Sequence, residues 1–231
     1  MSSPLFSLEG FLFLLRWFHI YMGVIWIGLL YYFNFVQGSF MKEAAAAAKP
    51  EVLGKLLPRA MWWFRWAAFW TMATGLTIVS IRGHQMMGYN NSWGVQILTG
   101  TLMGLVMGCN VWFVIHPAQK LVIANAVQTA AGGAAIPGAA EAGPRALLAS
   151  RTNTLLSVPM LWFMAAASHL SLPVTEVSRF PLYWIFAVLI IGIIEINALK
   201  GKLGPIETVK GVITGGFVLT AIFSLLMHVV L

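Results

Sequence analysis

The sequence predicts an all-α integral membrane protein, a single domain in which about six transmembrane helices form a bundle. Three observations predict it: the composition, the run lengths of apolar residues and the positions of the charges. Of 231 residues, 59% are hydrophobic and only 9% are charged, and the mean hydropathy is +0.83. A soluble domain usually carries about a quarter charged residues. A bilayer-spanning helix needs roughly 20 mostly apolar residues, so most of this chain is expected to lie in the membrane.

The apolar runs give the expected spans, and polar or small residues separate them. A polar, alanine-rich stretch at 42–59 is expected to form a short surface helix that ends at Pro58. Residues 118–131 are expected to continue the third span as a second surface helix. The segment 132–143 contains mostly small residues with nothing to bury, which predicts a flexible loop. The expected spans are 10–37, 61–81, 93–115, 154–172, 181–199 and 211–231.

The lysines and arginines predict the orientation, because the positively charged side of a membrane protein faces the cytoplasm. If successive loops alternate between the two sides, eleven of these residues lie on one side and three on the other. Both termini are then periplasmic, in the inner membrane of a bacterium. The net charge of +7 is explained by these loops and does not indicate nucleic acid. The cytoplasmic set is Lys42, Lys49, Lys55, Arg59, Arg65, Lys120, Arg145, Arg151, Lys200, Lys202 and Lys210, and the periplasmic set is Arg16, Arg82 and Arg179.

Two histidines at matching depth suggest a haem site. His19 lies about 7 Å outward from the centre of the first span, at 1.5 Å per residue. His169 lies about as far outward in the fourth span, which runs the opposite way. Two imidazoles at one level can bind a haem b from both faces. Gly23, one turn from His19, would let a macrocycle approach the backbone. Arg16, one turn outward on the same face, could pair with a propionate.

Simpler roles for the histidines remain open. A histidine inside a membrane can form a hydrogen bond to a neighbouring helix and do nothing more, although ionisable groups at that depth are costly and therefore often functional. His228, in the outer half of the last span, could bind a second haem, line a substrate site or be an ordinary interface residue. An interface position is expected for His84. A structural role at a helix end is expected for His116.

A second group of polar side chains is expected in the inner half of the bundle. Glu195 is the only carboxylate deep within a span, so it is expected to have a partner, and Arg151 is nearest by depth. A structural role in holding the bundle together is favoured over a proton path. A small transporter with its binding site here, and without haem, is a third alternative. The group comprises Asn34, Asn110, Arg151, Asn153, Glu195 and Asn197.

Three segments together resemble the membrane domain of the bacterial membrane-bound urate oxidases, also called urate hydroxylases. They are RWFHIYMGVIWIGLLYYFNFVQ at 16–37, NVWFVIHPAQK at 110–120 and SRTNTLLSVPMLWFMAAASH at 150–169. In that family a multi-span domain precedes a cytochrome c domain, and the two are thought to oxidise urate and pass electrons to the respiratory chain. This sequence contains no C-x-x-C-H haem-attachment motif, so the cytochrome is expected to be a separate periplasmic partner.

The residues and the resemblance together predict a membrane-bound haem b oxidoreductase similar to urate oxidase. One haem b, or two, would be bound by His19 and His169 as iron ligands, with Arg16 and His228 assisting. The electrons would pass to a periplasmic cytochrome c or another respiratory partner, and the substrate would be a small urate-like molecule. No residue set in the sequence identifies the substrate, which depends on the resemblance alone. The alternative is a non-catalytic, haem-carrying electron-transfer or assembly subunit of a respiratory complex.

Overall fold

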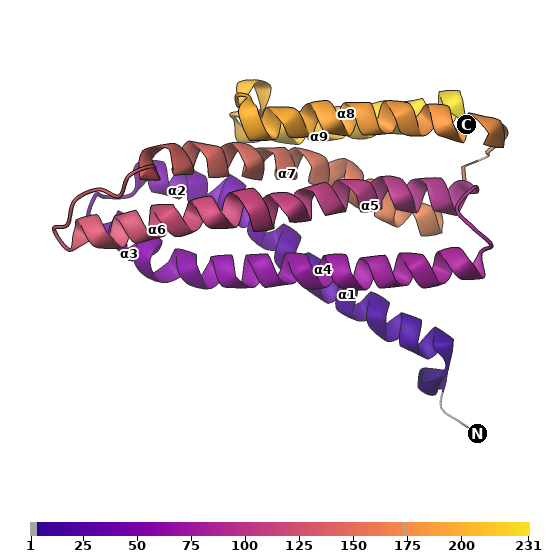
Figure 1. The fold of residues 1–231 in the computed structure, drawn as a ribbon, viewed down its shortest axis with the longest axis horizontal. Helices are drawn as coiled ribbons and strands as arrows, with labels where there is room; N and C mark the ends of the chain where they lie inside the picture. Colours follow the sequence, from indigo (N-terminus) through magenta and orange to yellow (C-terminus); the bar gives the residue numbers. More distant parts are fainter. Residues whose placement is uncertain (1–3, 173) are drawn as a thin grey trace.

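Long helices that run beside one another make up the fold (Figure 1). The computed structural model describes residues 4–172 and 174–231. Helices and loops, without a strand, account for all of this described part. The α-helices are α1 (Leu8–Tyr31), α2 (Gly38–Glu43), α3 (Ala48–Glu51), α4 (Leu57–Gln85), α5 (Ser92–Asn110), α6 (His116–Ala130), α7 (Ala139–His169), α8 (Phe180–Lys200) and α9 (Val209–Val230).

Three π-helical segments join consecutive α-helices without a break. Tyr32–Gln37 joins α1 to α2, Val52–Leu56 joins α3 to α4, and Val111–Ile115 joins α5 to α6. A π-helical turn widens the helix and is often found at functional sites. The first of these segments contains Asn34 and Gln37, and the third begins directly after Asn110, so two of the three adjoin the expected inner polar residues.

The connections differ from the expected ones in two places. The stretch 42–59 is not a separate surface helix: α2 ends at Glu43, and a new helix begins at Ala48 and continues into α4. Pro58 lies in the first turn of α4, where a proline is tolerated because its missing N–H has no helical partner. The expected loop 132–143 is also shorter, because α7 already begins at Ala139.

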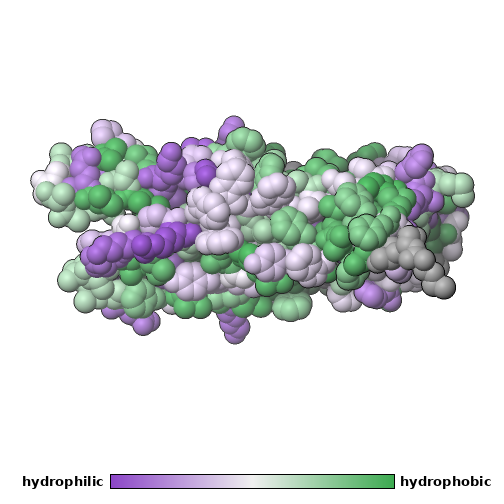
Figure 2. Space-filling model, turned by 90° about the horizontal axis from the view of Figure 1, so that it is seen from below, coloured by the Kyte–Doolittle hydropathy of each residue, from purple (hydrophilic) through white to green (hydrophobic). Residues whose placement is uncertain are grey.

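Four helical stretches of the described chain are long and apolar enough to cross a membrane. They are Leu8–Glu43, Ser92–Ala130, Val177–Lys200 and Val209–Val230. Helices α4 and α7 are also long, but the polar and basic residues along them make them less hydrophobic. In Figure 2, hydrophilic residues gather mainly toward the two ends of the long axis, with hydrophobic and intermediate ones between them. The fold is therefore compatible with a membrane protein.

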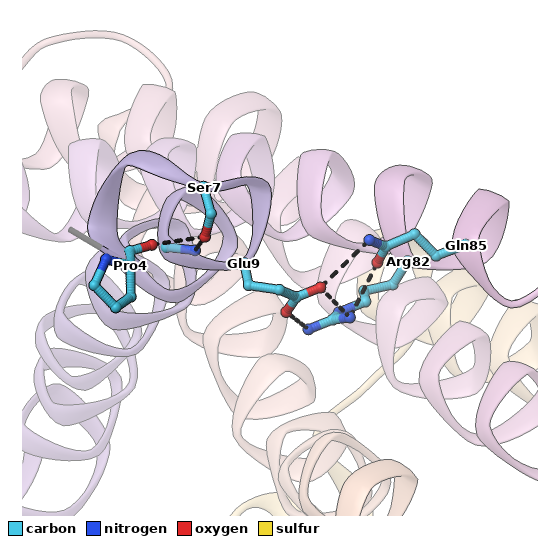
Figure 3. A network of polar contacts seen from close by, with 6 residues as sticks. Pro4, Ser7, Glu9, Arg82 and Gln85 are labelled. Carbon is cyan, nitrogen blue, oxygen red and sulfur yellow. Dashed lines mark hydrogen bonds and ion pairs between the residues drawn. The ribbon is translucent and has the colours of Figure 1, made fainter. Parts of the chain in front are cut away.

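Helix α7 is central to the packing, since it contacts α5 on one face and α9 on another. Helix α1 packs mainly along α4, and its N-terminal end lies apart from α5, α7, α8 and α9 (Figure 1). An ion pair joins the first turn of α1 to the last turn of α4 (Figure 3). Arg82 donates to both carboxylate oxygens of Glu9, at 3.1 and 2.7 Å, and Gln85 accepts from the same guanidinium.

Candidate functional site

His19 lies in the contact between α1 and α4. Its Nδ1 is 2.9 Å from the carbonyl oxygen of Thr71 and 3.2 Å from Oγ1 of Thr74. The imidazole also lies over Gly75, where an added Cβ would be 2.8 Å from Cε1 of His19. The imidazole can therefore pack this closely against α4 because Gly75 has no side chain.

The contact with Thr71 determines which ring nitrogen of His19 carries the proton. A carbonyl oxygen can only accept, so Nδ1 must be the donor. The hydroxyl of Thr74 already donates to the carbonyl of Trp70, at 2.6 Å, so its oxygen is a second acceptor for the same N–H. The neutral ring then has its lone pair on Nε2. Histidines that bind metals usually have this arrangement, with the other nitrogen bonded to a carbonyl or carboxylate.

His169 is the last residue of α7 and is exposed. The chain directly after it is held against the first turn of α5. Gln96 donates to the carbonyl of Leu170 at 3.0 Å, and the backbone N–H of Leu172 donates to Oγ of Ser92 at 2.9 Å. His169 therefore lies beside the beginning of α5, whereas His19 lies against α4.

The remaining two expected cofactor residues, Arg16 and His228, are both exposed. Within the described ranges, no hydrogen bond or ion pair joins His19, His169, Arg16 and His228 to one another. No three His, Cys, Asp or Glu side chains gather into a metal-binding group in that part of the chain, but a haem needs only two protein ligands.

Three of the six expected inner polar residues form a connected network, and Asn110 is at its centre. Asn34 and Arg151 are not part of it, and Asn197 donates instead to the carbonyl of Lys202 at 3.1 Å. The side-chain amide of Asn110 donates to Oδ1 of Asn153 at 3.0 Å and to Oε2 of Glu195 at 2.9 Å. Asn153 in turn donates to the carbonyl of Met107 at 2.8 Å. Helices α5, α7 and α8 are thus joined through three polar side chains. Asn110 and Asn153 are 2% and 0% exposed, so this network lies in the protein core.

The expected pairing of Arg151 with Glu195 is wrong. The partner of Glu195 is the amide of Asn110, and the ion pairs of the described chain, Glu51–Lys55 and Glu9–Arg82, do not include Arg151. Arg151 lies two residues before Asn153 on α7, so it projects from a different face of this helix than the one that contacts Asn110. Instead, Arg151 is 8% exposed, and its Nε and Nη1 are buried without a hydrogen-bond partner.

Another set of polar contacts joins α1 to α7 next to Arg151. Asn34 donates to Oγ of Ser150 at 2.8 Å and to the carbonyl of Leu30 at 2.9 Å. One turn away, the hydroxyls of Tyr31 and Ser157 are 2.9 Å apart. Ser157 donates to a carbonyl of its own helix, so Tyr31 is the donor in this contact.

Several of these residues were not expected from the sequence. Thr71 and Thr74 resemble ordinary helix residues, and only the packing of α1 on α4 shows that they orient His19. Ser92 and Gln96 likewise become important because the end of α7 lies on them. The sequence does carry one signal: in both pairs the two polar residues lie one helical turn apart.

Comparison with known proteins places the chain in a family. Residues 84–199, half of the chain, match the family described as urate oxidase N-terminal. The chain therefore belongs to this family, and its helices are compatible with a membrane protein. The matched range includes Asn110, Arg151, His169 and Glu195, whereas Arg16 and His19 lie before it. Neither the curated proteins nor the solved structures give a match.

Proposed function

We propose that the protein is a haem b oxidoreductase of the bacterial inner membrane that oxidises urate or a urate-like molecule and passes the electrons to a periplasmic cytochrome c. The family match over residues 84–199 is the observation that carries the reaction class. The excess of lysine and arginine on one side supports the orientation. The apolar helices support the membrane location.

The bond of His19 to the carbonyl of Thr71 supports a haem. It leaves Nε2 of His19 with a free lone pair and fixes the plane of the ring, as a ligand histidine requires. His169 is proposed as the second ligand, and Arg16 as the cation that neutralises a propionate. His228 is available for a second haem or for substrate. When bound, haem b supplies one-electron transfer between ferric and ferrous iron.

Binding of one haem by both His19 and His169 requires a particular arrangement of α1 and α7. Hydrogen bonds join α1 to α7 through Tyr31 and Asn34, in the inner half of the bundle. The outer half of α1 packs on α4 instead (Figure 1). For both histidines to bind one iron, the outer half of α1 must lie against the end of α7 in the haem-bound protein.

The absorption spectrum of the purified protein tests the haem. We expect a coloured protein with a low-spin Soret band and sharp α and β bands on reduction. His19→Ala and His169→Ala should each change the haem spectrum or lose the haem. His116→Ala should do neither, because His116 lies in the interior of the helical stretch Ser92–Ala130, far from Ser92, against which the end of α7 is held. A colourless protein after expression with ample haem would exclude this cofactor. Partial loss of absorbance in His228→Ala would indicate a second haem.

Turnover distinguishes the enzyme from the alternative, a haem-carrying subunit without catalysis of its own. The purified protein should oxidise urate with reduction of an added c-type cytochrome. A protein that binds haem and exchanges electrons with the cytochrome, but leaves urate unchanged, would be an electron-transfer or assembly subunit.

A further inference from the structure

Arg151 is a buried cation that forms no ion pair with any residue of the described ranges 4–172 and 174–231. Its side chain lies in the centre of α7 and is 8% exposed, and both Nε and Nη1 lack a hydrogen-bond partner. Leaving a buried charge unpaired is strongly unfavourable. An arginine guanidinium stays charged in proteins, so it cannot avoid the cost by losing its proton. A bound anion is the remaining way to compensate it.

The packing shows which side of α7 this guanidinium occupies. Leu148 and Leu155 lie three residues before and four residues after Arg151, and so share its face of the helix. That face packs against Phe35 of the π-helical segment that follows α1, and against Val212 in the first turn of α9. Arg151 is therefore located between that segment and the beginning of α9, where the positive end of the helix dipole also favours an anion.

A second unpaired group lies on the π-helical segment that packs against this part of α7. Asn34 is 3% exposed, and its amide nitrogen donates to Ser150, the residue before Arg151. Its amide oxygen, Oδ1, is buried and has no hydrogen-bond partner. The same π-helical segment also carries Gln37, 8% exposed, whose Oε1 is buried and unpartnered too. This region therefore offers unused donors from a cation and unused acceptors from amides.

These groups define the ligand by its chemistry. An anion with oxygens alone would satisfy Arg151 but would not supply a hydrogen to Asn34. We propose that Arg151 and Asn34 bind a planar heterocyclic anion that carries ring N–H groups beside its oxygens, with the guanidinium on the oxygens and the amide oxygen on an N–H. Urate has this pattern, so the inference names the substrate-binding residues of the proposed function and depends on it for the choice of ligand.

Thermal unfolding of the detergent-solubilised full chain with urate as the probe tests this site. A ligand that binds only the folded state raises Tm. Urate should raise the Tm of the wild type, and Arg151→Met should weaken urate binding at least about tenfold, or about 1.4 kcal/mol. Arg145→Met is the matched control, because Arg145 lies on the same helix but is exposed. It should respond to urate as the wild type does.

A second variant and a second anion test the two halves of the site separately. Asn34→Asp places a carboxylate beside Arg151, so it should raise Tm without ligand and remove the response to urate. Inorganic sulfate, which has no hydrogen to donate, should give no Tm shift that depends on Arg151 at equal ionic strength. An unchanged response to urate in folded Arg151→Met would overturn the site, and an equal response to sulfate would overturn the choice of a heterocyclic anion. His19→Ala should still bind urate, which separates this site from the haem proposal.

Discussion

The imidazole of His19 donates its Nδ1 proton to the backbone carbonyl of Thr71, across 2.9 Å and between two helices. This one bond connects the packing of α1 on α4 with the chemistry proposed for the site. A backbone acceptor cannot rotate away as a side chain can, and it belongs to a long helix. The ring orientation is therefore fixed by the fold itself, and Nε2 keeps its lone pair.

Gly75→Ala should disturb this arrangement without removing a polar group. The new methyl would lie 2.8 Å from Cε1 of His19, which is closer than real Cβ contacts, so the ring must shift. Overpacking of this kind typically costs about 1–3 kcal/mol. We expect a lower Tm in detergent and, if His19 binds haem, a lower haem content or a shifted Soret band.

Gly28→Ala is the control for this substitution. Gly28 lies on α1, the helix that packs on α4, but an added Cβ there meets nothing within 4 Å. Alanine is the better helix former by about 1 kcal/mol, so Gly28→Ala should leave Tm unchanged or raise it, with an unaltered spectrum. If both variants behave alike, the contact of Gly75 with His19 has no special role.

Asn110→Leu should destabilise the bundle more than Glu195→Gln. The leucine would leave Oδ1 of Asn153 without its donor in the core, and an unsatisfied buried polar group costs about 1–3 kcal/mol. Glutamine at 195 keeps an oxygen that can still accept from Asn110, and the position is only half buried. Thermal unfolding of both variants in detergent measures the difference. A larger loss in Glu195→Gln would show that the charge itself matters there.

The general architecture could be predicted from the sequence, because it follows from local composition. The length of the apolar runs alone indicates long helices. The expected second span ends at Ile81, close to the end of α4, and the expected fifth span begins at Pro181, close to the beginning of α8. The helix that continues through 118–130 is expected from the sequence and is confirmed. The boundaries at 42–59 and 132–143 differ from the expected ones, because alanine-rich and small-residue stretches do not by themselves distinguish a loop from a helix end.

Side-chain partners could not be predicted, because depth along a helix gives only one of the coordinates that bring two groups together. Arg151 and Glu195 are expected from the sequence to lie at similar depth, yet Asn110 is the partner of Glu195. The rotation of each helix about its own axis decides the pairing, and that rotation depends on packing with all neighbours. The same reason explains why the sequence does not identify Thr71 as the partner of His19.

The ion pair between Glu9 and Arg82 should contribute little to stability. Both oxygens of Glu9 are bonded by Arg82 (Figure 3), but the side chains are 62% and 28% exposed. Exposed pairs contribute about 0–1 kcal/mol and are weakened by salt. A double-mutant cycle with Glu9→Gln and Arg82→Gln, measured at low and high salt, should give a small coupling energy that falls as salt rises. A large, salt-independent coupling would mean that this pair is shielded from solvent.

The orientation of the bundle can be tested at its two best-placed loops. The connection between α4 and α5 contains Gly88, and the connection between α6 and α7 covers 132–138. If the eleven lysines and arginines of one side are cytoplasmic, a reporter inserted at Gly88 should be active only in the periplasm, and one inserted within 132–138 only in the cytoplasm. The helical stretch Ser92–Ala130 is the only one between the two positions, so both reporters would report the same side if it did not cross the membrane. The proposal that His19 and His169 lie at one depth would then fail with the topology.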